Sequence, residues 1–198
     1  MQITADLVKQ LRDRTGAGMM ECKKALAETA GDLDQAVDAL RKSGAAKAEK
    51  RADRAANEGR VDSYIHPGNR VGVLIEVNCE TDFVALTPEF EELVRNLAMQ
   101  TAAAGAEYVR REDVPAERIE RERAIYRAQM EGQNKPAAVI DKIVEGKLGR
   151  FYSEMCLLDQ PYIRDDKKTI ADIVQEAVAK TGENIVVRRF ARFRLGQD

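Results

Sequence analysis

The chain has 198 residues, of which 33% are charged, and its formal net charge is −2 at pH 7. This length suits one or two domains, and the balance of charges excludes a surface that is basic throughout. The three cysteines have no Cys-x-x-Cys spacing, which argues against a disulfide framework or a zinc site and fits a reducing compartment. The sequence has no signal-peptide pattern and no long apolar run, so we expect a cytoplasmic protein that binds no membrane.

The first 45 residues predict three short helices. Thr4 and Asp32 stand where the first and third helices would be capped, and a glycine follows each helix, with Gly44 ending the third. Apolar residues at helical spacing would form a shared core: Leu7, Val8 and Leu11, then Met19, Cys22 and Leu26, then Leu33, Ala36, Val37 and Leu40. We therefore predict a three-helix module over residues 1–45.

Residues 46–58 are rich in alanine, lysine and arginine and contain no large apolar side chain. Such a segment has high helix propensity but nothing to bury, so we predict an exposed helical linker with ion pairs along its surface.

Residues 59–198 predict an α+β core domain. Two runs of β-forming residues flank a His-Pro-Gly-Asn turn at 66–69, which is typical of a β-hairpin. In the second run one face would carry Val71, Val73, Ile75 and Val77. Thr87 and Pro88 then begin a helix. Its apolar stripe would consist of Phe90, Leu93, Val94, Leu97 and Ala98.

Two further helices begin at Pro115 and Pro136 and are separated by a short connection at 132–135. Because short connections join antiparallel neighbours, we predict a helical hairpin over about 115–157. A last helix from Thr169 to Gly182 and a strand over 183–195 complete an α+β fold with a small antiparallel sheet.

No catalytic, cofactor or metal site is expected. His66, in a predicted turn, is the only histidine, which argues against nucleophile, base and metal sites centred on histidine. The glycines at 16 and 18 lack the spacing and the preceding strand of a phosphate-binding loop. The segment RRFARFR at 188–194 mixes arginine with phenylalanine, as RNA-binding surfaces do. Strand alternation favours a plainer reading, with Val187, Phe193 and Leu195 facing the core and Arg188, Arg192 and Arg194 in solvent.

Two features leave alternatives open. In NCETDFVAL, at 78–86, Thr81 can cap one helical turn, and Phe83 either folds back into the core or is displayed to a partner. The local pattern slightly favours the core, whereas the adjacent charges and the corner position favour display. Met19 and Met20 are consecutive and cannot both face one helix stripe, so we expect Met20 to be exposed. Whether Met20 is a contact residue is undecided from the local pattern.

The chain resembles bacterial elongation factor Ts, the guanine-nucleotide exchange factor for elongation factor Tu, in motifs that follow the family's order: ITADLVKQLRDRTGAGMMECKKAL, GDLDQAVDALRKSG and VLIEVNCETDFVA. The resemblance implies that the first module is similar to a ubiquitin-associated domain and docks on the GTPase domain of elongation factor Tu. It also implies that Arg12, Met19 and Met20 are contacts in that module.

The same resemblance implies that Thr81, Asp82, Phe83 and Val84 disturb the magnesium and phosphate site of elongation factor Tu, with Phe83 as a wedge between two partner helices. It implies neither chemistry by this chain nor direct binding of nucleic acid. Longer family members carry a second core subdomain that does not fit within this length. The chain resembles the short form, which implies a homodimer, possibly through the core sheet.

Overall fold

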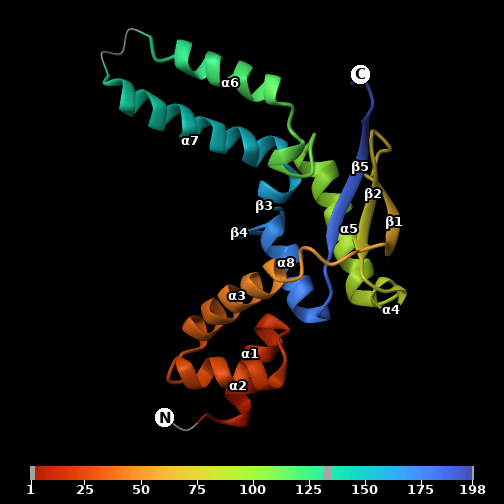
Figure 1. The fold of residues 1–198 in the computed structure, drawn as a ribbon. Helices are drawn as coiled ribbons and strands as arrows, with labels where there is room; N and C mark the ends of the chain where they lie inside the picture. Colours follow the sequence, from red (N-terminus) through yellow and green to blue (C-terminus); the bar gives the residue numbers. More distant parts are fainter. Residues whose placement is uncertain (1–2, 132–134, 198) are drawn as a thin grey trace. The chain divides into compact units, whose positions relative to one another are not determined.

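The computed structural model describes residues 3–131 and 135–197, and its fold is of the predicted α+β class (Figure 1). The α-helices are α1 (Ala5–Thr15), α2 (Met19–Glu28), α3 (Leu33–Glu49), α4 (Asp82–Ala85), α5 (Pro88–Ala104), α6 (Ala116–Ala128), α7 (Ala137–Met155) and α8 (Ile170–Thr181). The strands are β1 (Glu58–Ile65), β2 (Val71–Cys79), β3 (Pro161–Tyr162), β4 (Asp165–Thr169) and β5 (Val186–Arg194). Single 3-10 turns lie at Arg111–Asp113 and Leu157–Asp159.

The chain divides into two compact units. The first unit contains Met1–Val61, Glu76–Val94 and Asp172–Val187. The second unit contains Asp62–Ile75, Arg95–Ala171 and Arg188–Asp198. The sequence-based domain boundaries at residues 45 and 58 stay a prediction. Among the helices described, none has both the length and the apolar character that crossing a bilayer requires.

Helices α1, α2 and α3 begin where the capping residues indicate. The Thr4 hydroxyl accepts a hydrogen bond from Leu7 N at 3.3 Å. The Asp32 carboxylate accepts from Gln35 N at 2.9 Å, which satisfies a donor that the first turn of a helix leaves open. The buried side chains of this core are Val8, Leu11, Cys22, Ala25, Leu26 and Ala36. Except for Met19, the apolar positions predicted to pack together form this core or pack against it.

Two predictions near residue 45 are wrong. The third helix does not end at Gly44, and the predicted linker does not form a helix along its whole length. Helix α3 continues through Gly44 to Glu49, and residues 50–57 form turns and irregular structure. Gly44 is buried, and a Cβ built on it would lie 3.4 Å from the Cβ of Ala179 in α8. Gly44 therefore lies within α3 where that helix packs against α8, and it does not terminate α3.

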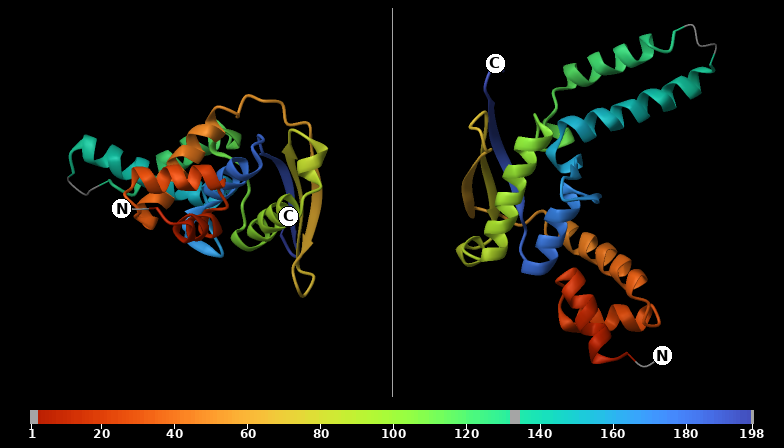
Figure 2. Two further views of the ribbon diagram at one scale, coloured as in Figure 1. Left: turned by 90° about the horizontal axis from the view of Figure 1, so that it is seen from below. Right: turned by 180° about the vertical axis from the view of Figure 1, so that it is seen from behind.

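The larger sheet has the strand order β1-β2-β5. A turn over residues 66–70 joins β1 to β2, with His66 N donating to Val71 O at 2.9 Å, as the sequence predicts. Gly59 has φ +143°, and a Cβ there would come within 2.2 Å of Val77 O, so only glycine fits beside β2. The predicted inner face of β2 is buried at Val73, Ile75 and Val77. Helix α5 runs along one face of this sheet (Figure 2).

The predicted face of β5 is wrong beyond Val187. Val187 is buried, but Phe193 is 72% exposed and Leu195 is 65% exposed. Arg188 and Arg189 are exposed in succession, which shifts the alternation by one residue. Further along the strand, the half-buried positions are consequently the even-numbered Phe190 and Arg192.

Helices α6 and α7 form the predicted hairpin. Arg123 pairs with Glu145 at 3.3 Å, and Arg127 pairs with Asp141 at 3.0 Å. Each of these pairs contributes little stability. Together they join residues that lie opposite each other on the antiparallel helices α6 and α7. The predicted connection at 132–135 lies, apart from Lys135, outside the described residues.

A second, two-stranded sheet formed by β3 and β4 is absent from the sequence-based prediction. It is anchored by the buried side chain of Gln100 in α5. The amide of Gln100 donates to Pro161 O at 3.1 Å and accepts from Ile163 N at 2.9 Å. A hairpin that depends on a side chain about 60 residues earlier leaves no periodic signal of its own.

Candidate protein-interaction site

The segment after β2 forms the single-turn helix α4, which Figure 1 shows between β2 and α5. Thr81 caps it as predicted: its hydroxyl accepts from Val84 N at 3.4 Å, and its carbonyl accepts from Ala85 N at 3.2 Å. Ala85 is buried and Val84 is half-buried, so this side of the turn is fixed to the protein. The opposite side carries Phe83.

Phe83 is displayed to solvent, with 80% of its surface exposed. The alternative that Phe83 folds back into the core is therefore wrong. Asp82 is exposed beside it, and Leu86, three residues further on, is 76% exposed. Residues three apart on a helical turn face the same way, so Phe83 and Leu86 form one apolar projection. Sequence analysis missed Leu86, although its spacing from Phe83 was a usable signal.

A second exposed surface lies where α1 turns into α2. Gly16 reverses the chain with φ +66°, and three residues separate the two helices. This turn places Arg12, in the last turn of α1, at the same end of the module as the first residues of α2. Met20 is 76% exposed, as predicted, but Met19 is also 60% exposed. The prediction that Met19 faces the core is wrong, because α2 turns Cys22, Ala25 and Leu26 inward.

The structure places both surfaces in the same compact unit of the chain. Each consists of flexible or aromatic apolar side chains next to a charged residue, which is the composition that protein contacts favour. Single exposed apolar residues are common and need no explanation. Two exposed apolar side chains that lie close together, on the capped turn α4 or in the first turn of α2, are better suited to binding a protein.

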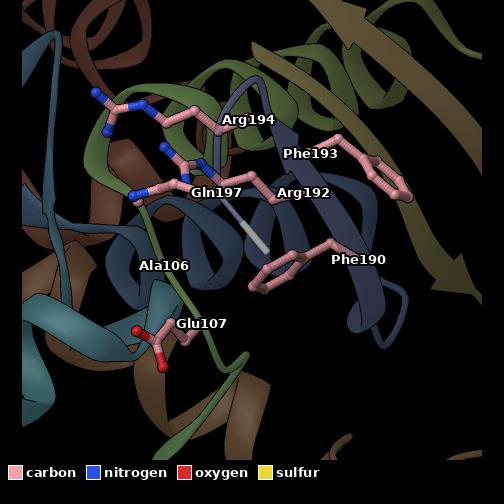
Figure 3. A pocket seen from close by; sticks show the side chains of 8 residues that line it. Ala106, Glu107, Phe190, Arg192, Phe193, Arg194 and Gln197 are labelled. Atoms are coloured by element: carbon pink, nitrogen blue, oxygen red, sulfur yellow. The ribbon is translucent and has the colours of Figure 1, made fainter.

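The arginine-rich strand β5 borders a groove of about 830 Å³ in the second unit, whose lining includes Gly105, Glu107, Phe190, Arg192 and Arg194. Figure 3 shows Arg192 and Arg194 on one side of β5 and Phe193 on the other. Arg192 donates to the carbonyl of Ala102 at 3.5 Å, so one nitrogen of its guanidinium is hydrogen-bonded within the protein. That the chain binds no nucleic acid directly stays a prediction.

Two of the three cysteines have raised pKa values, and the described residues contain no group of side chains that could hold a metal ion. Burial raises the pKa of Cys79 and of Cys156 to about 11, so both thiols are protonated at neutral pH and are poor nucleophiles. Across residues 3–131 and 135–197, no three or more His, Cys, Asp or Glu side chains are grouped to hold a metal ion.

Comparison with known proteins shows the family to which the chain belongs. The family model described as Elongation factor TS matches residues 2–197. Elongation factor Ts of Caldanaerobacter subterraneus subsp. tengcongensis is 58% identical over 195 residues, covering 98% of both chains. The proteins of the same name from Coprothermobacter proteolyticus and Pseudothermotoga lettingae are each 59% identical, over 197 and 198 residues, and cover both chains completely. These matches confirm the resemblance seen in the motifs, and the chain belongs to the elongation factor Ts family of translation elongation factors.

Proposed function

We propose that this translation elongation factor binds elongation factor Tu and promotes the release of bound GDP and its exchange for GTP. The observation that carries the proposal is the 80% exposure of Phe83 on a turn that is capped and anchored on its other side. A large apolar side chain held in water by a fixed backbone suits insertion into a partner.

In the proposed mechanism Phe83 enters between two helices of elongation factor Tu that support its phosphate and magnesium site. GDP is held there by backbone N–H groups, a lysine and a magnesium ion, which all depend on the position of those helices. A small shift of the helices weakens several charge-assisted contacts together. Asp82 supplies the adjacent polar contact, and Thr81 and Val84 shape the turn. The factor itself performs no chemical step.

The N-terminal module supplies a separate part of the binding energy. We assign Arg12, Met19 and Met20 to the contact with the GTPase domain of elongation factor Tu. Methionine side chains adapt to an irregular apolar surface, and arginine is enriched at protein interfaces. This contact holds the factor on its partner while the nucleotide leaves.

The proposal predicts that the factor and GDP weaken each other's binding to elongation factor Tu. Such coupling is reciprocal and typically changes each affinity by about 5- to 150-fold. Isothermal titration of the chain into nucleotide-free and into GDP-bound elongation factor Tu measures both affinities. We expect clearly tighter binding to the nucleotide-free form. Equal affinity for the two forms would contradict nucleotide exchange.

We further propose that the chain forms a homodimer through the outer face of its larger sheet. Ile65, Leu74, Phe193 and Leu195 lie exposed on this sheet or at its end, and they help to line a groove of about 590 Å³. A contiguous apolar surface of this kind is unusual on a protein that stays monomeric. A second copy of the chain offers the same surface and could cover it by two-fold symmetry.

The dimer prediction is tested by placing a charge on this face. Phe193→Asp should convert the protein to a monomer, because a carboxylate would be desolvated at the interface. Sedimentation equilibrium measures the mass, with Leu86→Asp as a control at a similarly exposed leucine on a different surface. A monomeric unmodified chain at micromolar concentration, or a dimeric Phe193→Asp variant, would refute the assignment.

A further inference from the structure

The turn that carries Phe83 is held by a residue about 100 positions later in the chain. Helix α8 ends at Thr181, and the next residue, Gly182, adopts φ +79° and reverses the chain. Glu183 N then donates to the hydroxyl of Thr181 at 3.3 Å, which fixes the backbone just after the helix. This ending directs the side chain of Glu183 to Thr81.

The carboxylate of Glu183 accepts three hydrogen bonds from the beginning of the turn. One oxygen accepts from Glu80 N at 3.1 Å and from Thr81 N at 3.0 Å. The other accepts from the Thr81 hydroxyl at 2.6 Å. Hydrogen bonds to an ionised acceptor are shorter and stronger than neutral ones, and these three converge on two consecutive residues.

The bond to the hydroxyl also determines how Thr81 caps α4. A hydroxyl has one proton, and donating it to Glu183 leaves the oxygen lone pairs for Val84 N. Glu183 therefore favours the hydroxyl orientation that capping requires. A helix of four residues cannot persist from backbone propensity alone, so its shape depends on such outside contacts.

The next residue, Asn184, ties a third segment to the same corner. Its backbone N–H donates to the carboxylate of Glu80 at 2.7 Å. Its buried side-chain amide donates to Ala52 O at 3.3 Å and to Arg54 O at 2.8 Å. The segment that leads from α3 to β1 is thus joined to the residue before Thr81, which makes the base of the turn rigid.

We propose that Glu183 is a positioning residue for nucleotide exchange: it holds the Thr81 turn in the form that displays Phe83 before the partner arrives. The inference rests on the proposed function. Without the three hydrogen bonds, the hydrophobic effect would favour conformations in which the Phe83 ring folds back against the protein. The ring would then have to be released before insertion, and the competent fraction would fall.

The first test needs no partner protein. Amide hydrogen exchange, followed by NMR, reports the bonds that Glu80 N and Thr81 N donate. In Glu183→Ala we expect their protection to fall by about tenfold or more. Glu183→Gln, which retains a neutral acceptor, should lose less amide protection. It replaces the alanine variant in this test if that variant is unstable. Asp172→Asn removes a carboxylate within α8 that pairs with Arg41 at 3.1 Å, and it should leave both amides unchanged. Unchanged protection in both Glu183 variants would overturn the inference.

The second test separates positioning from stability by GDP-release kinetics. The maximal release rate should fall about tenfold in Glu183→Ala and less in Glu183→Gln. The concentration giving half of that rate should change less than about twofold, because the Arg12, Met19 and Met20 surface is untouched. In a Phe83→Ala background the Glu183→Ala change should add no further loss, since both act through one ring. Asp172→Asn should release GDP as the unmodified chain does.

The outcomes distinguish the two proposals. An unmodified chain that does not accelerate GDP release overturns the proposed function, whatever the amide exchange shows. If the unmodified chain does accelerate release, a normal rate in Glu183→Ala overturns the positioning role. A loss in Glu183→Ala that multiplies fully with the loss in Phe83→Ala also overturns it, because the two residues would then act independently.

Discussion

Phe83→Ala is expected to slow the maximal rate of GDP release from elongation factor Tu by at least about 30-fold, which corresponds to about 2 kcal/mol. The ring is the larger of the two apolar side chains that the capped turn presents, and alanine cannot separate two partner helices. Phe83→Leu keeps part of the bulk and should give an intermediate rate. Stopped-flow measurements with a fluorescent GDP analogue report the rates directly.

The fold should tolerate this substitution. Because Phe83 is 80% exposed, its removal should change the free energy of unfolding by no more than about 0.5 kcal/mol. Thermal or urea unfolding checks this point. Ile125→Ala, at an exposed apolar residue of α6, is the matched control and should leave release unchanged. A Phe83→Ala variant that releases GDP within twofold of the unmodified rate would rule out the wedge.

The double variant Met19→Ala, Met20→Ala is expected to weaken binding to nucleotide-free elongation factor Tu by about 10- to 30-fold. Both side chains are more than half exposed, so their removal should change the stability of the folded chain little. It should remove apolar contact area from the interface and so weaken binding. The maximal release rate at saturating factor should stay the same. Loss of binding energy that is equal in all states of a reaction changes the half-saturating concentration and not the maximal rate.

Titration calorimetry gives the affinity, and release kinetics over a range of factor concentrations give the two kinetic parameters. Lys24→Ala lies on the same helix, where Lys24 pairs only loosely with Glu28 at 3.8 Å, and should have no effect. A double variant with unchanged affinity, or with a reduced maximal rate, would contradict the proposal that the methionines contribute to binding while Phe83 determines the release rate.

The parts of the fold that could be predicted from sequence depend on neighbours in the chain. Thr4, Asp32 and Thr81 cap helices through hydrogen bonds to residues two or three positions away. The β1-β2 hairpin follows from its turn and from alternation in β2. The amphipathic stripe of α5 follows from helical periodicity. In each case the sequence pattern and the physical cause span the same short segment.

The remaining features depend on contacts between distant segments. Gly44 resembles a helix stop until Ala179 is placed against it. The shift of faces in β5 and the β3-β4 hairpin have no local signal, and Gln100 anchors that hairpin from α5. The exposure of Phe83 was undecidable for the same reason, because Glu183 lies far away in the chain. The exposure of Met20 was predicted from the sequence, whereas the exposure of Met19, the contribution of Leu86 and the support from Glu183 were missed.

The most direct measurement of the central claim is the rate of GDP release from elongation factor Tu as the unmodified chain is added. The account predicts that the rate rises with the concentration of the chain, approaches a maximum, and loses most of this acceleration when Phe83 is replaced by alanine. A release rate equal to that of elongation factor Tu alone, at every concentration of the chain, would contradict it.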